Sequence, residues 1–138
     1  MKVYFYECGI WTGTNSLWHG LGLEGRMKQA RSEKGPGPFV VSFAGAGGKT
    51  SAIRRLAWEA LDRGLKVLVA TTTHMACPDA FGCLEGNVEE IRAGLEQRGL
   101  AVAGRPAENG KIAFTGRELY EEACSLADLV LVEADGSR

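Results

Sequence analysis

A glycine-rich segment between an apolar run and an amphipathic helical pattern constrains the fold of this chain more than any other feature. Phe39–Ala44 is apolar and rich in β-branched and aromatic residues, which is typical of a buried parallel strand. Gly45–Ser51, with the sequence GAGGKTS, follows it directly. Apolar residues then recur at the spacing of one helix face, at Ile53, Leu56, Ala57, Ala60 and Leu61. A second apolar run, Lys66–Thr71, completes a β-α-β unit of a parallel sheet.

The segment between the first strand and the helix has the chemistry of a phosphate-binding loop. Glycines let backbone N–H groups converge on phosphate oxygens, and the helix N-terminus adds free amides and a positive dipole. Lys49 supplies a charge for the β- and γ-phosphates and is a catalytic candidate, and the Thr50 hydroxyl can bind magnesium. The predicted nucleotide-binding residues are Gly45, Ala46, Gly47, Gly48, Lys49, Thr50 and Ser51.

The loop is shorter than a standard Walker A motif, GxxxxGK[ST]. The first glycine of that longer motif would fall at Phe43, so the pattern here is GxxGKT beginning at Gly45. It is similar to the shorter loops of Mur-type ligases, which bind ATP. The sequence leaves ATP and GTP open as the nucleotide bound with magnesium.

Polar residues follow the second predicted strand in the sequence Thr71-Thr72-Thr73-His74. Ligands of open α/β sheets lie at the carboxyl ends of the strands, so we expect Thr72 and His74 to face the nucleotide as catalytic candidates. A hydroxyl there can contact magnesium, phosphate or an attacking water, and His74 can act as a general base. Purely structural roles are the alternatives, with Thr72 capping a turn and His74 in a structural hydrogen bond.

Two acids follow the last predicted strand, Leu129–Val132. A carboxylate at such a strand end holds magnesium directly or through water. We assign Asp135 to the metal, together with Thr50, because its short side chain leaves room for a bridging water. Glu133 is then the candidate that orients Thr72 or an attacking water, as a catalytic residue.

The remaining pattern predicts further elements around this unit. Two capping boxes predict helices, one at Asn87 with Glu90 and one at Thr115 with Glu118. Short strands are expected on either side of the turn at residues 108–110, at residues 100–103 and 111–114. A short strand is also indicated at residues 3–6, and residues 32–38 have a linker composition. We therefore expect an N-terminal arm over residues 1–37 and a nucleotide-binding domain over residues 38–138.

Composition excludes several classes of protein. The net charge of -1 gives no reason to expect nucleic acid or an anionic membrane as a partner, and no apolar run approaches the length of a membrane span. The four cysteines are scattered without a CxxC pair, which indicates reduced thiols and a cytoplasmic protein. His74, Cys77 and Cys83 lack a fourth ligand at a zinc-site spacing, so we predict no structural zinc there.

Four segments together resemble one protein family. AGAGGKT at 44–50, TTTH at 71–74, Gly110-Lys111-Ile112 and LVEADGSR at 131–138 are similar to the YqeC family, accessory proteins of selenium-dependent molybdenum hydroxylases. The resemblance implies a P-loop nucleoside-triphosphatase fold and a molybdenum hydroxylase, or its maturation proteins, as partner. Family members continue beyond the EADGSR segment, so we expect the domain to be incomplete at its C-terminus.

The predicted fold is therefore α/β, a P-loop NTPase-like three-layer arrangement with a mainly parallel sheet. Three functions remain open at this point. The first is an NTP-hydrolysing factor in the maturation of selenium- and molybdenum-dependent hydroxylases. The second is an ATP-dependent kinase or ligase, which needs a second substrate site, and the third is a non-catalytic nucleotide sensor.

Overall fold

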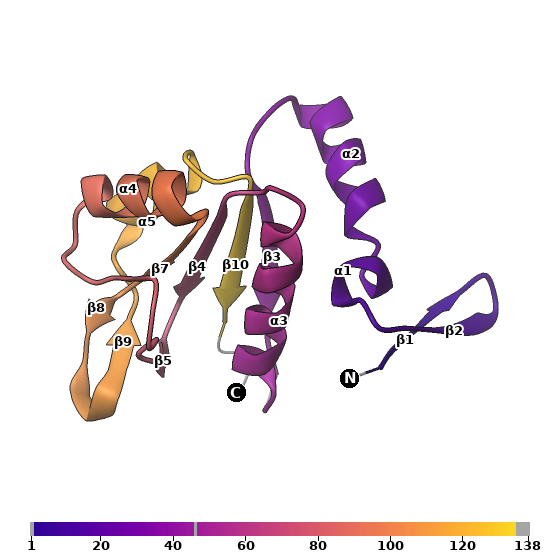
Figure 1. The fold of residues 1–138 in the computed structure, drawn as a ribbon, viewed down its shortest axis with the longest axis horizontal. Coiled ribbons are helices and arrows are strands. Elements are labelled where there is room, and N and C mark those ends of the chain that lie inside the picture. Colours follow the sequence, from indigo (N-terminus) through magenta and orange to yellow (C-terminus); the bar gives the residue numbers. More distant parts are fainter. Residues whose placement is uncertain (1, 46, 135–138) are drawn as a thin grey trace. The chain divides into compact units, whose positions relative to one another are not determined.

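The computed structural model describes residues 2–45 and 47–134, which fall into two compact units. The first unit is Met1–Gly37 and the second is Pro38–Arg138. Each unit has its own secondary structure (Figure 1). None of the helices in these residue ranges is both long and apolar enough to span a bilayer.

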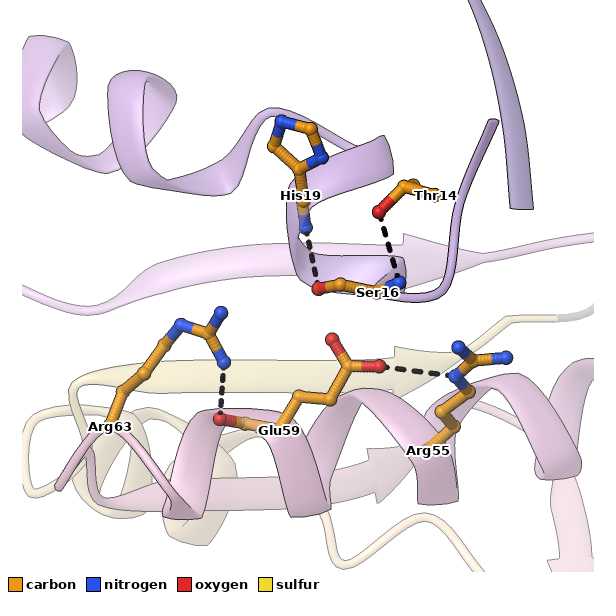
Figure 2. Close-up of polar contacts among 6 residues, drawn as sticks. All are labelled: Thr14, Ser16, His19, Arg55, Glu59 and Arg63. Carbon is orange, nitrogen blue, oxygen red and sulfur yellow. Dashed lines mark hydrogen bonds and ion pairs between the residues drawn. The ribbon is translucent and has the colours of Figure 1, made fainter. Parts of the chain in front are cut away.

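The first unit is a β-hairpin followed by two helices. Strands β1 (Val3–Glu7) and β2 (Ile10–Thr14) pair antiparallel, which confirms the short strand expected near the N-terminus. Helix α1 (Leu17–Gly20) begins after Ser16, whose hydroxyl accepts a hydrogen bond from the backbone N–H of His19 (Figure 2). Helix α2 (Leu23–Lys34) runs into the segment predicted as a linker, so the linker begins only at Gly35.

A five-stranded parallel sheet forms the centre of the second unit. Its strand order is β3-β10-β4-β7-β6, and each neighbouring pair is parallel. The strands, shown in Figure 1 except for an unlabelled β6, are β3 (Phe39–Phe43), β10 (Leu129–Glu133), β4 (Val67–Thr71), β7 (Leu100–Ala103) and β6 (Gly82–Cys83). The two central strands β10 and β4 are buried along their whole length, as their unbroken apolar sequences predict.

Helices cover both faces of this sheet, which gives the expected three-layer α/β fold. Because side chains alternate along a strand, Leu68 and Val130 pack on the side of α4 (Val88–Arg98) and α5 (Arg117–Cys124). Val69, one residue along β4, faces the opposite side with Ile53 of α3 (Lys49–Leu61). The arrangement is that of the P-loop NTPase-like class predicted from the sequence.

Helix α3 buries the apolar stripe read from the sequence. Its fully buried residues recur every three or four positions, at Ile53, Leu56, Ala57 and Ala60. Polar contacts run along another side of the helix (Figure 2): Arg55 Nε lies 3.1 Å from Glu59 Oε2, and Arg63 donates to the Glu59 carbonyl. The helix is thus fixed against the sheet, and its N-terminus directly follows the glycine-rich loop.

The two predicted capping boxes had different outcomes. Asn87 caps α4, since its Oδ1 accepts a hydrogen bond of 2.8 Å from the Glu90 backbone N–H. In a full capping box the Glu90 side chain accepts from the Asn87 backbone N–H. Here it accepts from the backbone N–H of Glu85 instead. The helix predicted at Thr115 exists as α5, but the predicted cap is wrong: its N-cap is Gly116, with no side-chain cap hydrogen bond.

A separate three-stranded antiparallel sheet lies beyond the main sheet. It consists of β5 (His74–Ala76), β9 (Lys111–Ala113) and β8 (Arg105–Pro106), in the order β5-β9-β8 (Figure 1). Both predicted short strands exist, but they do not pair with each other around the turn at residues 108–110. The 3-10 helix Glu108–Gly110 joins β8 to β9, while β7 belongs to the parallel sheet.

Candidate functional site

The glycine-rich loop has a backbone that only glycine adopts easily. Gly45, Gly47 and Gly48 have φ angles of +106°, +77° and +74°, and a Cβ built on any of them meets no atom of the described residues within 4 Å. As far as the described residues define it, the space in front of these glycines is open, and a side chain at any of the three would project into it. Ala46 lies outside the described residues.

Helix α3 begins directly at this loop. Gly48 is its N-cap and, having no side chain, leaves the first N–H groups of the helix without a hydrogen bond from the N-cap residue. An amide-lined helix start next to an open space matches the requirements of an anion site. Ser51, also predicted to bind the nucleotide, is exposed in the first turn.

Three predicted residues come together beside this loop. The Thr50 hydroxyl donates a hydrogen bond of 2.9 Å to Glu133 Oε1, and Lys49 Nζ donates to the Ala134 carbonyl at 3.3 Å. This meeting follows from strand order, because β10 pairs with β3 and places Glu133 opposite Phe43. The Glu133 residue is only 8% exposed.

The end of β4 supports Glu133 from its other side. The Thr71 hydroxyl donates to the Glu133 carbonyl at 3.1 Å, and the Thr72 backbone N–H donates to the same carbonyl at 3.0 Å. Thr71 Oγ1 also accepts from the Thr73 N–H at 3.2 Å, which closes a tight turn. Thr71 is almost fully buried, and its hydrogen bond to Glu133 joins the ends of β4 and β10, a role that the sequence alone does not indicate.

The remaining catalytic candidates are less closely joined to this group. Thr72 is exposed, and among the described residues its contact with Glu133 is a backbone one, from its N–H to the Glu133 carbonyl. His74 is exposed in β5, where it pairs with Ala113, and within residues 2–45 and 47–134 it forms no hydrogen bond to Lys49, Thr50 or Glu133. Asp135, assigned to the metal from the sequence, lies outside the described residues.

The cysteines of the rejected zinc pattern lie in different environments. Cys77 is exposed, whereas Cys83 is buried with its Sγ 3.6 Å from the Glu90 carbonyl. Burial, followed by the Glu90 carboxylate, raises the pKa of the Cys83 thiol above 9.0. In the described part of the chain, no three His, Cys, Asp or Glu residues cluster as metal ligands.

A cavity of about 210 Å³ lies on the α3 face of the sheet and reaches Thr50. Its walls come from α3, from β4 and β7, and from residues 75–81. No sequence signal identified it, because its lining residues belong to segments that are each unremarkable alone and meet only in the fold. Most of the lining is apolar, with Ile53, Ala57, Trp58, Val69, Met75 and Phe81 among its members.

Comparisons with known proteins identify the family of this chain. The family model described as "YqeC protein" matches residues 41–138, which include the whole described site. "Uncharacterized protein YqeC" of Escherichia coli (strain K12) is 32% identical over 107 residues, a match that covers 73% of this chain and 42% of that relative. The chain thus spans less than half of the relative's length, and no solved structure matches it. This chain belongs to the YqeC family.

Proposed function

We propose that the second unit binds a nucleoside triphosphate, ATP or GTP, together with magnesium at Gly45–Ser51. The single observation that carries this proposal is the hydrogen bond between Thr50 and Glu133 directly beside the open glycine loop. It joins the residue after the loop lysine to a nearly buried carboxylate on the neighbouring strand. Such a pair is the donor set that a magnesium–phosphate complex needs.

In this proposal, the loop and the start of α3 bind the phosphates through backbone N–H groups. Lys49 contributes its charge to the β- and γ-phosphates. Its ammonium group now donates only to a backbone carbonyl, at 3.3 Å, among the contacts of the described residues. Lys49 can therefore exchange this contact for a phosphate oxygen without breaking an ion pair.

Magnesium fits the oxygen donors at this site. It prefers one or two carboxylates with hydroxyl, phosphate and water oxygens, and Thr50 and Glu133 offer a hydroxyl and a carboxylate within hydrogen-bond distance. When bound, the ion neutralises charge on the terminal phosphates. We therefore assign Glu133, with Thr50, to the metal, while the metal role of Asp135 stays a prediction.

We further propose that the nucleotide serves an NTPase-type accessory role in the maturation of selenium- and molybdenum-dependent hydroxylases. A hydroxylase or one of its maturation proteins is then the partner, in the cytoplasm. Thr72 and His74 are the candidates for orienting an attacking water, because they follow the end of β4, the strand beside Glu133. Family membership and the nucleotide-site geometry support this role.

The nucleotide assignment is tested by calorimetry with Mg·ATP and Mg·GTP. Lys49→Ala should weaken binding by about tenfold to a hundredfold, which corresponds to losing a charged contact of about 1.5–3 kcal/mol. Lys66→Ala is the matched control, since it removes another lysine that is exposed and distant from the loop in sequence. Equal affinity of the wild type and both variants would refute the loop assignment.

A further inference from the structure

The cavity on the α3 face begins where the proposed nucleotide ends. Thr50 contributes to both places: its hydroxyl contacts Glu133, and the residue also lines the cavity. In phosphate-binding loops of this type, the lysine and the following hydroxyl residue serve the β- and γ-phosphates and their metal. The cavity therefore adjoins the terminal phosphate, the end of a nucleotide that faces away from its base.

The size and lining of the cavity define what can enter it. A volume of about 210 Å³ equals the space of about seven water molecules, enough for one ring with a short substituent. The walls are mostly apolar, and two aromatic side chains meet there. The rings of Trp58 and Phe81 pack edge to face, with 5.7 Å between their centroids. Such a lining favours a compact, ring-shaped apolar body.

Phe81 holds its position in the cavity wall with an unusual backbone. Its φ angle is +67°, a region that bulky side chains rarely adopt. Its carbonyl accepts a hydrogen bond of 2.8 Å from the Val102 N–H, and the Arg98 guanidinium lies 5.5 Å from the centre of its ring. Strained residues of this kind gather at ligand sites, so the backbone of Phe81 supports a ligand site independently of the cavity volume.

The charges at the cavity favour one acidic group on the ligand. Arg54 lines the cavity one helical turn after Thr50, and among the described residues it forms no ion pair, unlike its neighbour Arg55. The other charged lining residue, Asp79, comes from a different wall segment, residues 75–81. A single anionic group is therefore attracted to the α3 side, next to Thr50, and disfavoured near Asp79.

We propose that this cavity is a second ligand site for a small carboxylic acid with an apolar, ring-sized body. Its carboxylate faces Arg54 and the terminal phosphate, and its body lies between Trp58 and Met75. The position of the carboxylate at a terminal phosphate rests on the proposed nucleotide site. It places a co-substrate next to the nucleotide within the described residues, as a kinase or ligase requires.

The test uses benzoate as the anionic probe and benzamide as its neutral isostere. NMR titration follows the indole N–H signals of the tryptophans, with the Trp58 signal identified by Trp58→Phe. Benzoate should shift the Trp58 signal in the millimolar range expected for so small a ligand. Benzamide should bind at least about tenfold more weakly.

Two arginine variants isolate the role of charge. Arg54→Gln should weaken benzoate binding about tenfold and bring it to the level of benzamide. Arg92→Gln is the matched control, because Arg92 is an exposed arginine of α4 outside the cavity lining, and it should bind benzoate like the wild type. Absence of a Trp58 shift, equal binding of benzamide, or equal effects of the two variants would overturn the proposal.

The titration repeated with saturating Mg·ATP separates this proposal from the proposed function. Benzoate and nucleotide should bind together, and displacement of benzoate by ATP would mean that the cavity holds part of the nucleotide, which overturns the second site. Lysine-dependent nucleotide binding without benzoate binding would refute the cavity proposal alone. Benzoate binding without any nucleotide binding would refute the proposed function and, with it, the acid's position at a terminal phosphate.

Discussion

At the residue scale, the site shows what a motif can and cannot specify. The loop pattern identifies Lys49 and Thr50, because their positions at the start of a helix follow from local sequence. The acid that meets Thr50 depends on which strand lies beside β3 and on where β10 ends. A single sequence contains neither fact, and the structure brings Glu133 to within 2.9 Å of Thr50. Asp135 lies outside the described residues, so its metal role stays a prediction.

The buried thiols give a residue-scale prediction about alkaline pH. Burial raises the pKa of Cys83 and of Cys124 above 9.0, and burial with a hydrogen bond to Cys124 raises the pKa of Tyr120 to about 12. Above pH 9 the thiols ionise first in the unfolded chain, which favours unfolding. The contribution is complete below that pH and is lost as the pH rises through the folded-state pKa.

Urea denaturation measures this effect between about pH 8 and about pH 10. The free energy of unfolding should fall over this interval, and Cys83→Ala should reduce the fall. Cys77→Ala is the control, because it removes a cysteine side chain that is exposed. A slope that is the same in the wild type and in Cys83→Ala would contradict the account of the buried thiol.

At the element scale, helix starts depended on more than the capping pattern. Asn87 and Thr115 each stand three residues before a glutamate, yet only Asn87 caps its helix. At Thr115 the following Gly116 has a φ angle of +103°, and the chain enters α5 one residue later. A flexible glycine next to the predicted cap moved the helix start, which propensity rules for single residues do not capture.

This difference predicts unequal costs for two similar substitutions. Asn87→Ala removes the 2.8 Å hydrogen bond to the Glu90 N–H and should destabilise the second unit by about 1 kcal/mol. Thr115→Ala should change the free energy of unfolding by less than about 0.5 kcal/mol, because its hydroxyl caps no helix. Urea denaturation of both variants checks the prediction, and a larger loss for Thr115→Ala would contradict the observed helix start.

At the scale of the whole molecule, local patterns predicted the elements and the fold class better than their arrangement. The sequence patterns identify β3, β4, β7, β10 and α3, and burial on both faces imposes the compositions of β4 and β10. The two-residue strand β6 was not predicted. The small sheet of β5, β9 and β8 was not predicted, because it joins segments far apart in sequence. The cavity beside Thr50 was missed for the same reason.

The central claim is that Lys49, Thr50 and Glu133 form a magnesium–nucleotide site, and magnesium dependence tests it most directly. Nucleotide affinity is measured by calorimetry with magnesium and with a chelator, for the wild type, Glu133→Gln and the control Glu118→Gln, which changes an exposed acid of α5. Asp135→Asn enters the same titration, to test the sequence-based assignment.

We predict that magnesium strengthens binding in the wild type and in Glu118→Gln. In Glu133→Gln the ratio of nucleotide affinity with magnesium to that without it should fall by about tenfold or more. The amide can still accept a hydrogen bond from Thr50, but it has lost the charge that the metal needs. A full magnesium gain in Glu133→Gln, or its loss in Asp135→Asn alone, would contradict this site.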